Sequence, residues 1–284
     1  MLRSHRASQN LRLALAWLFV LLTLLFLLFP FYWMALTALK SNRELYDITA
    51  MPLWVRDGIT LEHFTSLLQG SNFPIWLKNS LLVSTTVTFI TLFVSVPAAY
   101  AITRLTFPGQ NGLALGVFLA YLVPPTLLFI PLARTMVSWG LFDSLGALVA
   151  AYPTFTVPFA TWLLMGYLKG IPRELEEAAM VDGASRLRAL WTVVLPVASP
   201  GLVTVTLFAF TLSWGHMIYA MAFVSRSTEK VLPVGLVTEM VRGDVFFWGP
   251  LMAGALLAAI PVLLLFAFLT RYFVAGLTAG ATKY

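Results

Sequence analysis

The stretch Glu177-Ala178-Ala179-Met180-Val181-Asp182-Gly183, followed after nine residues by Val193-Val194-Leu195-Pro196, decides how the rest of this sequence is interpreted. It is amphipathic and lies among long runs of apolar residues. A short helix, a glycine turn and a second helix in this position would lie at a membrane surface and face water. We therefore interpret residues 169–200 as a loop that presents two short helices to a soluble partner.

The composition indicates a chain that lives in lipid. Of its 284 residues 60% are hydrophobic and 11% are charged, and the mean hydropathy is +0.86; soluble domains carry about 25% charged residues. A helix needs about 20 apolar residues to cross a bilayer core about 30 Å thick. Charge-free runs of this length predict an all-α, polytopic membrane protein with six transmembrane helices, within residues 13–39, 79–103, 105–133, 144–168, 189–225 and 245–270.

The basic residues predict the orientation. Arg3, Arg6 and Arg12 precede a first run that is too long for a signal peptide, which indicates an uncleaved anchor with a cytoplasmic N-terminus. An even number of spans returns the C-terminus to the cytoplasm and places residues 169–200 there as well. The three arginines could also form a nucleic-acid-binding arm, but we expect no nucleic acid partner. Because the chain has no cysteine, disulfides and thiolate metal sites are excluded.

Prolines indicate that the third apolar run is not a straight helix. Pro124, Pro125 and Pro131 fall within eight residues, and each removes a backbone hydrogen bond that lipid cannot replace. We expect a broken or strongly curved helix that borders a pathway. The alternative is that proline is simply common in membrane helices.

Local signals predict the structure of the 169–200 loop. Pro172 suits a first helical turn, and the carboxylates that follow it would be stabilised by the positive end of the helix dipole. Gly183 can take a positive φ and end the first helix. Ser185 could cap a second helix that Leu195-Pro196 stops. The alternative interpretation is an ordinary cytoplasmic loop with an interfacial helix.

The spacing E-A-A, three residues, G, nine residues, I-x-L-P resembles the EAA loop of ABC importer permeases. The sequence has Val193 in place of the isoleucine. The resemblance implies the transmembrane fold of a type I ABC importer, in which this loop docks into a cleft on an ATPase subunit. The residues that it implies at the docking surface are Glu176, Glu177, Ala178, Ala179, Asp182, Gly183, Leu195 and Pro196.

More specifically, Glu-Glu-Ala-Ala, Asp-Gly-Ala and the closing residues 276–281 look like the smaller permease of maltose-type carbohydrate importers. This implies a single permease domain over residues 1–284 that forms half of a pathway, with residues 275–284 as a cytoplasmic tail that reaches between the ATPases, or as a frayed end. The implied partners are a second, different permease, two ATPase subunits that bind ATP and Mg, an extracytoplasmic solute-binding protein and the lipid of the inner membrane.

Other classes of function fit less well. The chain has no Walker loop, and its three histidines are scattered, so we expect no catalysis, no cofactor and no metal in this chain itself. A secondary transporter would usually show inverted repeats and more spans. The same machine could import another solute, such as a glycerol phosphate or an amino sugar.

One departure from the family pattern concerns the pathway. Similar permeases read W-N-[D/E]-x-[L/F] where this chain has Trp214-Gly215-His216-Met217-Ile218. An ionisable residue within a span usually faces the bundle interior or a water-filled cavity. The alternative is a structural histidine, bonded to a helix carbonyl or lying near the outer interface. Residues expected along the pathway are Trp214, His216, Met217, Pro124 and Pro125.

Overall fold

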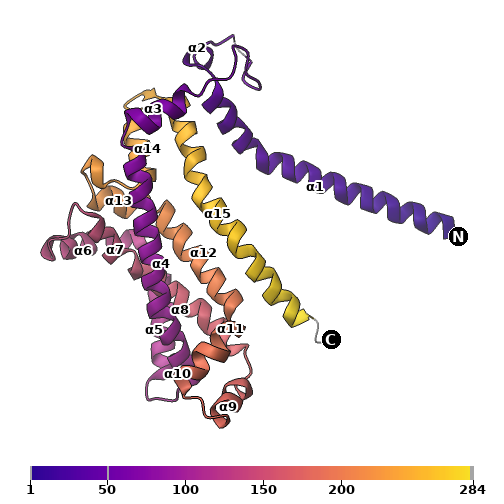
Figure 1. The fold of residues 1–284 in the computed structure, drawn as a ribbon, viewed down its shortest axis with the longest axis vertical. Coiled ribbons are helices and arrows are strands. Elements are labelled where there is room, and N and C mark those ends of the chain that lie inside the picture. The colour runs from indigo at the N-terminus through magenta and orange to yellow at the C-terminus, as the bar shows by residue number, and fades with distance from the viewer. Residues whose placement is uncertain (1, 50, 282–284) are drawn as a thin grey trace. The chain divides into compact units, whose positions relative to one another are not determined.

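The computed structural model describes residues 2–49 and 51–281, and the side chains of residues 10–49 and 51–270. Most of this described chain is helical, which confirms the all-α prediction (Figure 1). The contacts divide the chain into two compact units. The first runs to Ser71 and includes Thr238–Leu257; the second comprises Asn72–Val237 and the chain from Ala258 onward.

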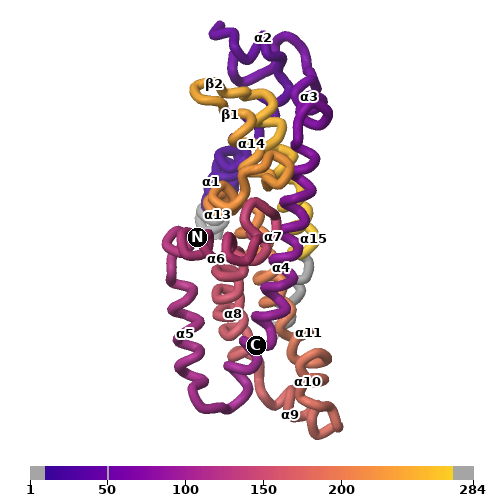
Figure 2. Tube along the Cα trace, turned by 90° about the vertical axis from the view of Figure 1, so that its left-hand side faces the viewer, coloured from indigo at the N-terminus to yellow at the C-terminus, as the bar shows by residue number. Residues whose placement is uncertain are grey.

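The second unit is built on three helices that run side by side, α4 (Phe73–Arg104), α8 (Pro153–Lys169) and α12 (Ser199–Gly215). Helix α5 (Gln110–Leu122) packs beside α8. Figure 2 shows α9 (Glu174–Val181) and α10 (Arg186–Ala189) at one end of this unit and α14 (Leu232–Met240) towards the other. Since α4 has 32 residues and is therefore about 48 Å long, its two ends can lie on opposite sides of a bilayer.

The remaining elements of this unit connect the long helices. Buried side chains form two apolar cores, one centred on Val83, Leu148 and Tyr219 and one on Tyr100, Leu164 and Val194. The connecting elements are α6 (Pro125–Ser138), α7 (Leu145–Ala151), the π-helix η1 (Leu190–Val194), α11 (Leu195–Val197), α13 (Met217–Phe223) and the short 3₁₀-helix η2 (Ser227–Glu229).

Among the described residues, four helical stretches are long and apolar enough to cross a membrane: Asn10–Leu39, Phe73–Arg104, Leu145–Lys169 (α7 and α8 in succession) and Trp248–Thr270. Two further pairs pass only when taken together. One joins Gln110–Leu122 to Pro125–Ser138 with a bend of 95°, and the other joins Arg186–Val197 to Ser199–Gly215 with a bend of 79°. The expected break in the third apolar run is thus confirmed, while the count of six spans holds only if each bent pair is one span.

The predicted stop of the second loop helix at Leu195-Pro196 lies within two residues of the observed end, Val197, where the chain bends by 79°. The helix continues through η1 and α11 and turns only at Ala198. Pro196 has no N–H to donate, and its ring crowds the carbonyl four residues earlier. The wider π turn before it, closed by a bond from the Leu195 N–H to the Leu190 carbonyl, lets the chain pass a proline without ending the helix.

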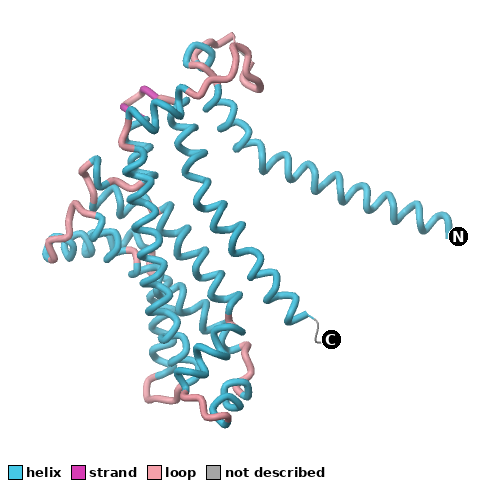
Figure 3. Tube along the Cα trace, in the orientation of Figure 1, coloured by secondary structure: helices cyan, strands magenta, loops and turns pink. Residues whose placement is uncertain are grey.

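The first unit contains α1 (Leu2–Leu39), α2 (Asn42–Leu45), α3 (Glu62–Gly70) and the start of α15 (Trp248–Ala281). It also holds the one strand pair of the described chain, the antiparallel hairpin β1 (Val241–Arg242) and β2 (Val245–Phe246) (Figure 3). None of the most apolar window of α1 is buried within the protein. Such a helix requires lipid or another apolar surface around it.

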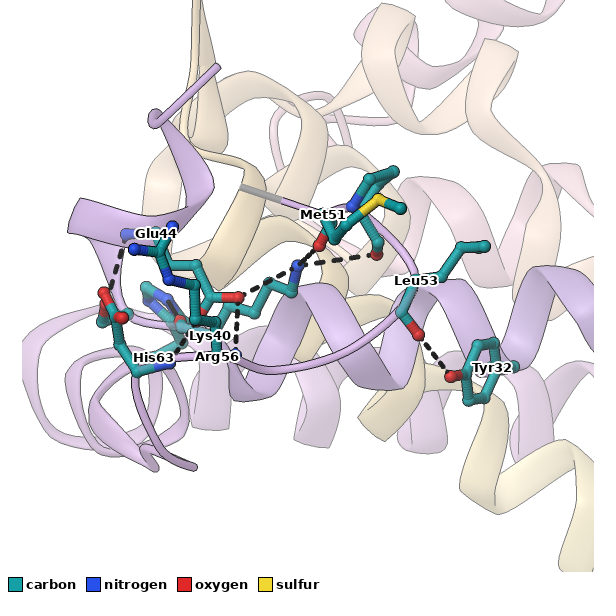
Figure 4. A network of polar contacts seen from close by, with 10 residues as sticks. Tyr32, Lys40, Glu44, Met51, Leu53, Arg56 and His63 are labelled. Atoms are coloured by element: carbon teal, nitrogen blue, oxygen red, sulfur yellow. Dashed lines mark hydrogen bonds and ion pairs between the residues drawn. The ribbon is translucent and has the colours of Figure 1, made fainter. Parts of the chain in front are cut away.

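A buried polar network closes the segment that follows α1 (Figure 4). Lys40 and Glu44 are 4% and 3% exposed and lie 3.2 Å apart. The Lys40 ammonium also donates to the Met51 carbonyl at 2.8 Å, and Glu44 accepts from the backbone N–H groups of Arg56 and Asp57 at 2.9 and 3.1 Å. Burial acts to raise the pKa of Glu44, but these donors together lower it below its ordinary value.

Candidate coupling site and pathway

The helix-turn-helix predicted for the 169–200 loop is present. Helix α9 carries acidic residues throughout its first turn, Gly183 has a φ of +89°, and the Ser185 hydroxyl accepts from the Arg188 N–H at 3.3 Å to cap α10. The difference is at the start, because α9 begins two residues after Pro172. Glycine adopts a positive φ without steric cost, so the turn at Gly183 is the one that its residue type favours.

Three large apolar side chains of the segment from α9 to η1 are exposed. Val181, Leu187 and Trp191 are 87%, 66% and 63% exposed. Large apolar side chains that are grouped at an exposed surface indicate an interaction site. The residues of the predicted docking set that share this exposure are Glu177, Ala178, Asp182, Gly183 and Pro196, with Ala179 half-buried.

Two members of the predicted docking set face the interior instead. Glu176 is 5% exposed: Tyr100 donates a hydrogen bond to one of its carboxylate oxygens, and the other lies 3.6 Å from Nε of Arg104. Leu195 is 8% exposed and belongs to an apolar core. Glu176 and its neighbour Glu177 lie on different faces, because successive residues of a helix point about 100° apart.

Two arginines tie the helix ends at this site together. Arg104, the last residue of α4, donates through Nη2 to the carbonyls of Leu168 and Ile171 at 3.0 and 2.8 Å. Arg173, which precedes α9, donates to the carbonyl of Thr103 at 2.9 Å. The last carbonyls of a helix have no partner within it, and a cation is favoured beside them. Arg104 therefore supplies hydrogen-bond donors to carbonyls at the end of α8, and Arg173 supplies one to a carbonyl at the end of α4.

Sequence reasoning missed Tyr100, Arg104 and Arg173 as functional residues. The orientation argument rested on Arg3, Arg6 and Arg12 and assigned no role to these three residues. A signal was present in Arg104, since it directly follows an apolar run of span length. A cation at that position is suited to the C-terminal carbonyls of a membrane helix. Which helix it would reach could not be derived from its position alone.

The expected pathway residues lie at two helix breaks that the structure brings together. One break is at Pro124, between α5 and α6, and the other is at His216, between α12 and α13. The Tyr219 hydroxyl donates to the carbonyl of Pro125 at 2.8 Å, and the Tyr219 ring lies 4.7 Å from the His216 ring. Tyr219 thus connects the breaks, and nothing in its sequence context singled it out.

His216 is half-buried among aromatic rings. Its imidazole stacks on Phe155 at 4.8 Å, and its carbonyl accepts from the Tyr152 hydroxyl at 3.1 Å. The ring nitrogen Nδ1 is buried and has no hydrogen-bond partner among the described residues. Met217 is half-buried beside it. Trp214 differs from the expectation, because it is 7% exposed and stacks on Phe210 within the protein.

The C-terminal tail is described only in part. The backbone from residue 275 to Ala281 continues α15 as a helix, and residues 282–284 lie outside the described residues. The expected contact of residues 275–284 with partner subunits therefore stays a prediction.

A mostly helical membrane chain with an exposed helix-turn-helix at one end of its core, and broken helices within that core, has the features of a transport permease. The chain belongs to the family of binding-protein-dependent transport system inner membrane components, whose model matches residues 92–279. It is therefore a multi-pass inner-membrane protein.

Relatives and solved structures agree over nearly the full chain. It is 34% identical to the inner membrane ABC transporter permease protein YcjP of Escherichia coli K12, covering 92% of this chain and 93% of that protein. It is 34% identical to the diacetylchitobiose uptake system permease protein DasC of Streptomyces coelicolor, covering 90% and 92%. A chain of a bacterial ABC transporter that imports alginate shares its fold, with a TM-score of 0.79 and 21% identity over 94% and 98% of the two chains.

Proposed function

We propose that this chain is the permease subunit of an ATP-driven importer and forms half of the pathway for a carbohydrate. The observation that carries the docking role is the exposure of Val181, Leu187 and Trp191, on the segment from α9 to η1 at one end of a packed helical core. The carbohydrate is supported by the names of relatives, which are permeases for diacetylchitobiose, for trehalose or maltose, and for sulfoquinovosyl glycerol. A glycosidic bond or sugar ring is common to all of these solutes.

The partners follow from this role. The face of α9 and α10 contacts one of two ATPase subunits in the cytoplasm, which bind ATP and Mg; this chain contributes no catalytic residue. A second, different permease forms the other half of the pathway, and an extracytoplasmic solute-binding protein delivers the solute. Support for the last comes from a solved alginate transporter of similar fold, which is described in complex with a periplasmic protein that holds an alginate pentasaccharide.

The orientation follows as well. Both termini and the 169–200 loop are cytoplasmic in this proposal, while the network at Lys40 and the loop at Glu229 face outwards. Approach of the ATPases displaces α9, and the contacts of Arg104 and Arg173 pass that displacement to α4 and α8. Helix α12, which packs against both, then carries it to the break at His216.

Reconstitution tests this function directly. The complex of this chain with the subunits expressed from neighbouring genes should accumulate a labelled sugar in vesicles only when ATP is supplied, and the chain alone should not hydrolyse ATP. The panel should include maltose, trehalose, a chitobiose, a glycerol phosphate and a free amino sugar, because these separate the carbohydrate from the alternative solutes. Robust hydrolysis by the isolated chain, or uptake without ATP, would refute the proposal.

A second experiment tests whether His216 lines the pathway. A neutral imidazole can donate and accept hydrogen bonds, which suits a hydroxylated solute. His216→Ala should then change the order of preference among the sugars while the ATPase subunits still bind. His216→Asn, which retains a donor and an acceptor, should change it less. An unchanged preference together with a lower melting temperature of the complex would instead identify a structural histidine.

A further inference from the structure

We propose that Glu176, Tyr100 and Arg104 form the joint through which movement of the docking helix α9 reaches α4 and α8. This inference rests on the proposed function and names the side chains that connect the docking face to the membrane helices. The three residues lie in contact at the end of α4, where both carboxylate oxygens of Glu176 have a partner on that helix.

The backbone alone is a weak connection between α8 and α9. Only residues 170–173 link the two helices, and Gly170 is among them. A short link with a glycine permits α9 to pivot when a partner pulls on it. Side-chain contacts must therefore supply the stiffness that a coupling element needs.

The geometry of the contacts at Glu176 supplies that stiffness. Tyr100 and Arg104 are four residues apart on α4, so they lie on the same face and hold the carboxylate at two points. Attachment at two points resists rotation of α9 as well as translation. In the same way, Arg104 contacts this carboxylate, the Leu168 carbonyl in the last turn of α8 and the Ile171 carbonyl just after it, so one planar guanidinium links three helices.

Burial keeps the side chains of this joint together. The side chains of Arg104 and Glu176 are 5% and 6% exposed. Leaving one partner of a buried ion pair without the other is strongly unfavourable, so the pair stays closed while its surroundings move. The neighbouring Glu174 is exposed, and the described chain shows no hydrogen bond or ion pair of its carboxylate. Glu174 is therefore a matched control on the same helix.

The test compares Glu176→Gln with Glu174→Gln in the reconstituted complex, measuring sugar transported per ATP hydrolysed and hydrolysis in the absence of sugar. Glu176→Gln keeps the size of the side chain and removes the charge that Arg104 faces. Because the ion pair with Arg104 is lost and the acceptor of the Tyr100 hydroxyl becomes uncharged, we expect transport per ATP to fall about tenfold. Glu174→Gln should couple as the wild type does. Tyr100→Phe removes only the hydroxyl and should give an intermediate loss.

The outcomes separate this joint from a merely structural role and from the proposed function. Glu176→Gln with a lower melting temperature but wild-type transport per ATP would overturn the joint. If Glu176→Gln fails to assemble, Tyr100→Phe decides: reduced coupling supports the joint, and wild-type coupling overturns it. A wild-type complex that transports no sugar with ATP would refute the proposed function, and this is seen before any substitution is made.

Discussion

Replacing Gly183 with valine should disrupt docking through backbone strain alone. Gly183 has a φ of +89°, and a side-chain carbon added there meets no atom within 4 Å, so no clash contributes. A left-handed backbone costs an L-residue about 1 to 2 kcal/mol, and a β-branched residue tolerates it least. The free energy is small, but 1 to 2 kcal/mol changes a two-state ratio by about 5- to 30-fold.

The expected result is therefore an apparent affinity for the ATPase subunits about 5- to 30-fold weaker in Gly183→Val, since the unstrained turn would separate α9 from α10. Titration of the permease with purified ATPase, read by co-purification and by sugar-stimulated hydrolysis, measures this. Gly183→Asn is the matched control, because asparagine enters the left-handed region more easily than other residues. Wild-type affinity in the valine variant, with the asparagine variant also unchanged, would refute the argument from the turn.

Further predictions concern orientation, pH and packing. In sealed cells an impermeant thiol reagent should label a cysteine introduced at Glu229 and not one at Arg186; the wild type offers no background, since it has no cysteine. The pKa of Glu44 in the folded protein is below its ordinary value of 4.5. Its contribution to stability is therefore present above pH 4.5 and is lost as the pH falls through the folded-state pKa. Melting temperatures measured against pH should show this loss, and the Glu44→Gln variant should not show it. Gly201→Ala should lower stability by about 1–3 kcal/mol, because the new carbon would lie 2.6 Å from the Tyr167 ring; the same change in a Tyr167→Ala background should cost less.

The features that sequence predicted well depend on interactions between near neighbours. The turn at Gly183 and the cap at Ser185 follow from the conformations that glycine and serine favour, whatever surrounds them. The break at Pro124 follows from the missing N–H groups of the proline cluster. The apolar runs predicted helices because lipid requires every backbone group to be bonded within the segment.

The features that sequence missed depend on contacts between distant residues. Glu176 and Arg104 are far apart in the chain, and their pairing arises only when α4 and α8 pack side by side. The burial of Trp214 likewise depends on which face of α12 meets the core. The helix end expected at Pro196 lies one residue from the observed end at Val197, but the π turn before it was missed, because no residue type indicates a π turn.

The exchange of arginines between helix ends has a consequence for protein engineering. Arg104 hydrogen-bonds a carbonyl at the end of α8, and Arg173 hydrogen-bonds a carbonyl at the end of α4. Each helix end therefore depends on an arginine from the other segment. If only the 169–200 loop of a relative replaced the loop of this chain, the relative's residue at position 173 would have to bond the end of an α4 with which it did not evolve. An exchange of ATPase-docking specificity between transporters should therefore succeed when the 169–200 loop and the last turn of α4 are replaced together.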